Sequence, residues 1–242
     1  MLPIEDDSII HPVKSKKDKE LPPVGIFFVT PGEASTAVAD VLQDGGERRF
    51  LHNSNLAVSR DGGRFVAGPA LGAPAAALVM EKLIVLGAQR IILMGWCGAV
   101  DPSCSIGDII VPDRAVVGEG TSKYYGNNET VKPCAASNVV MKKLLDREQL
   151  GYREGAIWST DAPYRESREM LRTLQMKYQI LGIDMEFSAL CSVAVFRSVS
   201  FCAVLLVSDE LWGPRWKPGF KDRRFIERRK NILEMLLARN VE

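Results

Sequence analysis

Residues 201–209 read FCAVLLVSD, a run of seven apolar residues that ends on a serine and an aspartate. An apolar run of this length bounded by polar residues predicts a buried β-strand. In open α/β sheets the ligand crevice lies at the carboxyl ends of the strands. Asp209 is therefore expected at a ligand site.

The segment just before this strand predicts a helix with a second polar cluster at its start. Residues 182–186 read GIDME, and Met185, Ala189, Val193 and Phe196 then recur at helical spacing. This helix leads directly into the strand at 201–207. Glu186 and Asp209 consequently flank one helix–strand unit.

Strand and helix signals alternate along the rest of the chain. Strands are predicted at 24–29, 64–68, 90–95, 107–111, 114–117 and 155–159, and helices from Glu33 and at 73–86, 135–148, 167–178 and 222–238. Such alternation predicts an α/β fold in which helices sandwich a sheet. Residues 95–100, GWCGAV, are interpreted as a loop whose glycines let the backbone approach a ligand.

Length and composition favour one globular domain that acts on a small molecule. We predict a single domain over residues 1–242, with residues 1–23 as an N-terminal lead-in. The 31 Lys and Arg nearly balance the 30 Asp and Glu, which argues against nucleic-acid and membrane partners. Five cysteines without metal or redox spacing, and no signal-peptide pattern at the N-terminus, predict a cytoplasmic protein without a metal.

The first predicted strand ends in a turn suited to an anion. Thr30, Pro31 and Gly32 link it to a helix, so the free N–H groups of the helix N-terminus face the strand end. Many such turns hold nothing, and the sequence leaves both readings open.

Taken together, these segments resemble the nucleoside phosphorylase family, which includes purine nucleoside phosphorylase, uridine phosphorylase and the methylthioadenosine nucleosidases. The resemblance covers most of the chain and rests on motifs in family order: TPGE (30–33), LGAP (71–74), LGA (86–88), GWCGAV (95–100), GDII (107–110), STD (159–161), DME (184–186) and VSD (207–209). It implies a three-layer α/β/α sandwich with a central mixed sheet and cleavage of a nucleoside's N-glycosidic bond.

The resemblance assigns roles to four residues. Met185 and Glu186 match the family pair that holds the ribose hydroxyls, and Asp209 matches the acid that protonates a purine as it leaves. Asp209 favours purines, although uridine stays open. His11 resembles a histidine that reaches the ribose of a neighbouring subunit, which implies a dimer-based homo-oligomer, up to a hexamer. The structural alternatives are a solvated helix glutamate, a helix N-cap aspartate and a frayed N-terminal histidine.

The phosphate site departs from the family pattern. Gly32 fits, but Thr36 and Leu93 stand where phosphorolytic members carry arginines, and Trp96 replaces a serine or threonine. We expect Gly32, Glu33, Trp96 and Thr121 to form a phosphate or water site. Inorganic phosphate is expected as a co-substrate without any other cofactor, and a phosphate-independent nucleosidase or a catalytically silent nucleoside-binding protein remain alternatives.

The base pocket is the least defined part of the predicted site. Trp158, Tyr164, Arg165 and Arg168 fall in the region that resembles the base-recognition segment. The Gln and Arg that read uracil in uridine phosphorylases are replaced by Ser167 and Glu169. Surface charge at a helix start is the alternative for the two arginines.

Overall fold

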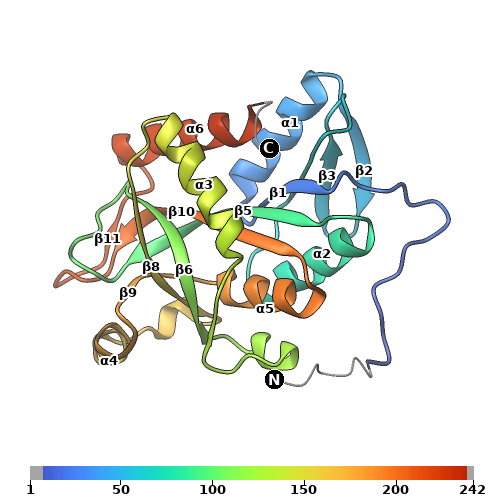
Figure 1. Cartoon of the computed structure of the whole chain (residues 1–242). Helices are drawn as coiled ribbons and strands as arrows, with labels where there is room; N and C mark the ends of the chain where they lie inside the picture. Colours follow the sequence, from blue (N-terminus) through green and yellow to red (C-terminus); the bar gives the residue numbers. More distant parts are fainter. Residues whose placement is uncertain (1–7, 239–242) are drawn as a thin grey trace.

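The computed structural model describes residues 8–238 as a three-layer α/β/α structure around a mixed β-sheet (Figure 1). Its strands are β1 (Val24–Phe28), β2 (Glu47–Leu51), β3 (Ser54–Val58), β4 (Phe65–Gly68), β5 (Arg90–Ala99), β6 (Ile109–Gly118), β7 (Thr130–Val131), β8 (Tyr152–Thr160), β9 (Ile180–Asp184), β10 (Ser200–Glu210) and β11 (Lys217–Pro218). The helices are α1 (Pro31–Gln43), α2 (Ala73–Val85), α3 (Ala135–Arg147), α4 (Arg168–Tyr178), α5 (Phe187–Arg197) and α6 (Arg223–Leu237), with short 3₁₀ turns η1 (Ser122–Tyr125) and η2 (Pro163–Arg165). The predicted fold class is confirmed.

The centre of the sheet closes on itself. Strand β10 pairs with β6 and also with β5, and β6 leads through β8 and β9 back to β5. The β5–β10 and β6–β8–β9 pairings are parallel, whereas β10–β6 and β5–β9 are antiparallel. The strands β1, β4, β3 and β2 extend this closed part on one side.

Alternate side chains of the central strands enter two different cores. On β5, Ile91 and Leu93 face the core formed with α2 and α5, whereas Ile92 and Met94 face the core formed with α1, α3 and α6. Figure 1 shows these helix groups on opposite sides of the sheet. The period of two along a strand places its apolar residues alternately on both faces. This is why the central strands read as continuous apolar runs.

Two predictions about the sheet are corrected by the structure, and some of its strands were not predicted. Residues 95–99 are not a loop, because β5 continues to Ala99 against β10. The strands predicted at 107–111 and 114–117 are one strand, β6, with a register shift between Pro112 and Arg114. The hairpin β2–β3 and the strand β9 were not predicted from the sequence; β2 is mostly exposed and therefore lacks an apolar run.

The described part of the lead-in lies along the body of the molecule. The Leu21 amide donates to the Leu86 carbonyl at 2.7 Å, and Lys82 donates to the Val13 carbonyl and to Asp18, both at 2.7 Å. Residues 1–7 of the predicted lead-in lie outside the described residues. Within residues 8–238, no helix is long and apolar enough to cross a bilayer.

Helix α6 offers a matched test of the packing. Ile232 is fully buried in the core, whereas Ile226 on the same helix is 45% exposed. We expect Ile232→Ala to lower the free energy of unfolding by about 2–5 kcal/mol, since it removes buried methyl groups and leaves a cavity. Ile226→Ala should cost well under half as much in the same urea titration. Equal costs would contradict the described packing of α6.

Candidate active site

A cavity of about 590 Å³ opens where several strands end. It lies at the carboxyl ends of β1, β5, β9 and β10, as expected for a ligand crevice in an α/β sheet. Its lining residues include Thr30, Trp96, Gly98, Tyr164, Glu166, Asp184, Met185, Glu186, Ser208, Asp209, Trp216 and Phe220. The structure thus brings together residues that are far apart in the sequence.

Glu186 lies at the junction between β9 and α5. Its side chain is buried, and its Oε1 accepts the backbone N–H of Gly72 at 2.6 Å. Gly72 is the N-cap of α2, so the start of a second helix fixes this carboxylate. Met185 lines the cavity beside it.

A buried polar network holds the backbone at this junction. Asp184 Oδ2 accepts the N–H groups of Glu186 at 3.2 Å and Phe187 at 2.7 Å, and its Oδ1 accepts the Ser159 hydroxyl at 2.5 Å. Ser159 Oγ in turn accepts the Ser188 N–H at 2.9 Å. Asp184 therefore satisfies the first turn of α5 and fixes the direction in which Glu186 leaves it.

Two carboxyl groups in this small volume change their acidity. Burial, and then the charge of Asp184, raise the pKa of Glu186 above its usual range. Burial also raises the pKa of Asp184, while its hydrogen bonds from Ser159 and the α5 backbone oppose that rise. When such a buried carboxyl group is ionised, hydroxyl groups that donate to it and nearby positive charge stabilise it.

Asp209 lies at the end of β10 and lines the same cavity. Its Oδ1 accepts the Ser208 hydroxyl at 2.6 Å, and its Oδ2 accepts the indole N–H of Trp216 at 2.7 Å. Gly98 on β5 must lack a side chain, because a Cβ there would lie 2.3 Å from Leu211 and 3.1 Å from Asp209 Oδ2. The glycine thus makes room for the carboxylate.

Glu33 occupies the first turn of α1. The residue is 3% exposed. Its Oε2 accepts the Thr30 hydroxyl, its Oε1 accepts the Trp96 indole N–H at 3.2 Å, and Oε1 lies 3.6 Å from the Arg229 guanidinium. The ring of Trp96 also packs edge-on against Phe225. The partial positive charge of the helix N-terminus here faces a carboxylate from the same helix.

A family model described as the phosphorylase superfamily matches residues 23–238. The chain belongs to this superfamily. It is 30% identical over 150 residues to the DeoD-type purine nucleoside phosphorylase of Clostridium novyi (strain NT), a match that covers 60% of this chain and 64% of that protein. The chain therefore spans less than two thirds of the length of this relative.

Solved structures of other proteins share the fold. The purine nucleoside phosphorylase of Toxoplasma gondii in complex with immucillin-H superposes with a TM-score of 0.77 at 20% identity, covering 94% of this chain and 93% of that one. A futalosine hydrolase mutant of Helicobacter pylori gives a TM-score of 0.72 at 17% identity, covering 89% and 97%. The chain thus shares its fold with a solved phosphorylase and a solved hydrolase.

The two positions predicted to have lost a phosphate-site arginine supply no charge here. Leu93 is fully buried in the core, and the Thr36 hydroxyl donates to the Gly32 carbonyl at 2.9 Å. Gly32 itself is exposed at the start of α1. Arg229 of α6 is a cation paired with Glu33 at this end, and the sequence analysis did not single it out.

The residues predicted for base recognition lie in different places. Tyr164 lines the cavity, whereas Trp158 is packed in a core cluster with Leu171 and Ile180. Arg168 donates to the carbonyls of Gly213, at 2.7 Å, and Pro214, and neither it nor the exposed Arg165 lines the cavity. Arg168 instead ties the start of α4 to the loop after β10.

Glu166 was not singled out from the sequence, although it lines the cavity. It follows the short turn η2 and is half-buried. Burial and the charge of Asp209 raise its pKa to about 7. Its only sequence signal is its position between two residues, Arg165 and Ser167, in the segment that resembles the base-recognition region.

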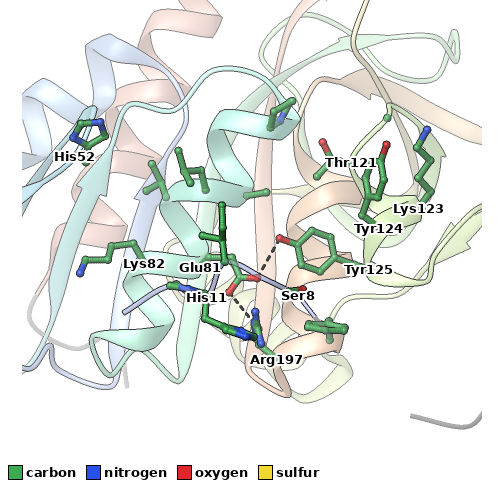
Figure 2. Close-up of a pocket in the computed structure, with 18 of the residues that line it drawn as sticks. Ser8, His11, His52, Glu81, Lys82, Thr121, Lys123, Tyr124, Tyr125 and Arg197 are labelled. Carbon is green, nitrogen blue, oxygen red and sulfur yellow. Dashed lines mark hydrogen bonds and ion pairs between the residues drawn. The ribbon is translucent and has the colours of Figure 1, made fainter. Parts of the chain in front are cut away.

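His11 and Thr121 line a separate, larger cleft of about 900 Å³. Figure 2 shows both residues there, together with Glu81, which is bonded to Tyr125 and Arg197. The adjoining Glu119 accepts the Ser188 hydroxyl at 2.8 Å, which links this cleft to the network around Asp184. In the single chain, His11 and Thr121 thus lie apart from the cavity lined by Glu186.

The buried Glu186 predicts a measurable dependence of stability on pH. Its pKa is raised in the folded protein, so unfolding releases a proton as the pH rises above the ordinary value of 4.5. The wild type should therefore lose stability between pH 5 and pH 8. In Glu186→Gln the decrease in the free energy of unfolding from pH 5 to pH 8 should be smaller by roughly 1–3 kcal/mol, because one pKa unit is worth about 1.4 kcal/mol.

Urea unfolding at both pH values measures this difference. Glu227→Gln, which changes an exposed glutamate on α6, is the matched control and should behave like the wild type. If Glu186→Gln shows the same loss from pH 5 to pH 8 as the wild type, the carboxyl group is not held in a raised-pKa state.

Proposed function

We propose that this chain cleaves the N-glycosidic bond of a purine nucleoside and that water is the attacking group. Membership of the phosphorylase superfamily supports bond cleavage, and the cavity at the strand ends supports a nucleoside-sized ligand. The purine preference rests on Asp209, which lines the same cavity as Glu186.

The buried carboxylate of Glu33 is the observation that favours water over phosphate as the attacking group. It lies in the first turn of α1, the turn whose N–H groups would otherwise attract an anion, and three contacts hold it there. A phosphate dianion at this end would meet a fixed negative charge and no arginine at position 36 or 93. A neutral water molecule meets no such repulsion.

The same group can activate the water. Thr30 lines the cavity and donates its hydroxyl proton to Glu33. A water that donates to Thr30 Oγ1 would pass its proton toward the carboxylate as its oxygen attacks the sugar. Glu33 acts through Thr30 in this scheme, with Trp96 and Arg229 fixing its position.

The ribose fits at the Glu186 end of the cavity. An ionised Glu186 accepts two hydroxyl protons, and its negative charge stabilises the positive charge that develops on the sugar as the bond breaks. Met185 offers the apolar contact beside it. The Asp209 end then receives the base, where leaving-group protonation is required.

Phosphorolysis is the second candidate, favoured by the DeoD-type phosphorylases among the relatives. Arg229 is the group that would have to support it, because its guanidinium is 40% exposed and already lies at this end. It would have to leave Glu33 to bind phosphate. A catalytically silent nucleoside-binding protein is the third reading.

A nucleoside panel assayed with and without phosphate tests the proposal. We expect release of free purine base at a rate independent of inorganic phosphate. Glu33→Gln should lower kcat by about 100-fold or more, since it removes the proton acceptor. Trp96→Phe, which keeps an aromatic ring but removes the N–H donor, should lose much less.

Three other outcomes have distinct meanings. Base release that requires phosphate and yields a sugar phosphate would establish phosphorolysis. Calorimetric binding of nucleosides with no base release would establish the silent reading. A Glu33→Gln enzyme that works at the wild-type rate would remove Glu33 from the mechanism.

We also propose that a second copy of this chain covers the larger cleft. Four exposed apolar side chains surround it: Ile10 (88% exposed), Phe50 (79%), Leu78 (61%) and Tyr124 (76%). A concentration of apolar surface of this kind marks an association face. His11 at the same cleft would then lie at the interface, in line with its predicted contact with a neighbouring subunit.

Sedimentation equilibrium tests this assembly. The wild type should be a dimer or a multiple of dimers, and Phe50→Glu should shift it to monomer, because a charge would be buried in the interface. Met176→Glu changes an equally exposed apolar residue on α4, away from the cleft, and should leave the mass unchanged. A monomeric wild type would exclude the proposed dimer.

A further inference from the structure

Trp216 lines the cavity and is bound to the carboxyl group of Asp209. The residue directly precedes β11, and its indole Nε1 donates to Asp209 Oδ2 at 2.7 Å. The sequence analysis did not single it out, because this contact joins the end of β10 to the loop that follows it. The contact bears directly on proton transfer from Asp209 to a departing base.

The loop that carries Trp216 is anchored on both sides of the ring. Before it, the carbonyls of Gly213 and Pro214 accept the guanidinium of Arg168, with the Gly213 contact at 2.7 Å. After it, β11 pairs antiparallel with the end of β10. The ring centroid also lies 6.3 Å from that of Phe220. Although Trp216 is 58% exposed, its N–H group is therefore a pre-organised donor.

An indole N–H group differs from water as a partner for an acid. It donates a hydrogen bond and cannot accept one. A proton on Asp209 Oδ2 would face the N–H of Trp216, so this contact keeps the acidic proton off that oxygen. A water molecule in the same place could accept the proton and carry it into solvent, whereas the indole cannot. The acidic proton of Asp209 is thereby confined to Oδ1.

The Ser208 hydroxyl accommodates a proton on Oδ1. Its Oγ lies 2.6 Å from Asp209 Oδ1 and 3.3 Å from the carbonyl oxygen of Cys97. A hydroxyl group both donates and accepts. When Oδ1 is protonated, Ser208 can accept that proton's hydrogen bond and donate to Cys97; when Oδ1 is ionised, Ser208 can donate to it. Both protonation states of Asp209 therefore keep a partner at Oδ1.

We propose that Trp216 is the positioning residue of the acid. Its N–H group confines the proton of Asp209 to Oδ1 and stabilises the carboxylate that remains once the proton has left. Hydrogen bonds to a carboxylate are stronger than those to a neutral carboxyl group, so the contact strengthens as the proton moves to the base. The inference rests on the proposed nucleoside cleavage with Asp209 as its acid.

The step balances in atoms and charge. The bond between C1′ and the base nitrogen breaks, and its electron pair stays on the base. The proton on Asp209 Oδ1 moves to a ring nitrogen of the base, which departs neutral, while the oxygen of water bonds to C1′. The proton that the water loses returns through solvent to Asp209. Trp216 keeps its own N–H proton throughout.

Two tryptophans of the same loop give a matched pair of variants. Trp216→Phe keeps an aromatic ring and removes the N–H donor to Asp209. We expect it to lower kcat for adenosine and guanosine by about 10- to 100-fold, the effect of losing one hydrogen bond to a charged group. Trp212 donates instead to the Cys104 carbonyl at 3.1 Å. Trp212→Phe should therefore stay within about threefold of the wild type, since it leaves Asp209 untouched.

Methylated substrates separate this role from that of a wall residue. A 7-methylpurine nucleoside already carries the positive charge that protonation would supply, so its base leaves neutral without a proton. In Trp216→Phe the rates for 7-methylguanosine and 7-methyladenosine should stay within about threefold of the wild type, because they need no acid. The loss of a stacking or wall contact would slow all four nucleosides alike. Inorganic phosphate is present throughout, so the comparison does not depend on which group attacks the sugar.

A double-mutant cycle gives an independent readout. In an Asp209→Asn background, Trp216→Phe should cause no further loss of kcat for adenosine, because its effect passes through the carboxyl group. Trp212→Phe in the same background is again the control.

The outcomes distinguish this inference from the proposed function. The positioning role is overturned, while nucleoside cleavage stands, if Trp216→Phe cleaves adenosine and guanosine at the wild-type rate. It is also overturned if the variant slows methylated and unmethylated nucleosides equally, or if it causes its full loss in the Asp209→Asn background. If the wild type cleaves none of the four nucleosides, the proposed function has failed and the inference falls with it.

Discussion

The parallel ladder between β5 and β10 is the contact on which the rest of the structure depends. It runs from Ser200 opposite Arg90 to Glu210 opposite Ala99, with one register shift after Val207. This pairing closes the central strands on themselves and places the end of β10 against the end of β5. Asp209 and Gly98 meet only because of it, and the shift at that point turns the chain into the cavity wall.

Carboxyl groups dominate the electrostatics at the cavity. Glu186 and Asp209 line the cavity, Glu33 lies beside it in the first turn of α1, and Arg229 is the described cation paired with one of these three carboxyl groups. Burying carboxylates costs stability, and here the cost is limited by backbone N–H groups and hydroxyls from Gly72, Ser159 and Ser208. Under the proposed function, these carboxyl groups would favour a neutral nucleoside that becomes positive as its bond breaks over a phosphate dianion.

Much of the architecture was predictable from the chain. The apolar runs at 24–29, 90–95 and 201–207 became β1, β5 and β10, because strands covered on both faces carry almost no polar residues. The extension of β5 through Trp96 to Ala99 was not, since its glycines mimic a loop. Glycine is needed at these positions because Val29 and Leu205 would crowd a Cβ at Gly95, and Leu211 and Asp209 would crowd one at Gly98. These contacts exist only in the folded structure.

The sequence by itself determined the alternation of strands and helices, the polar residues that follow the strands, and the superfamily motifs that include Glu186 and Asp209. These depend on local periodicity and on short segments. Only the tertiary structure decided that Glu166 shares a cavity with Asp209, that Trp96 and Arg229 hold Glu33, and that Trp158 belongs to the core. Each of these depends on residues brought together from distant parts of the chain, and burial and mutual charge exist only once the chain has folded.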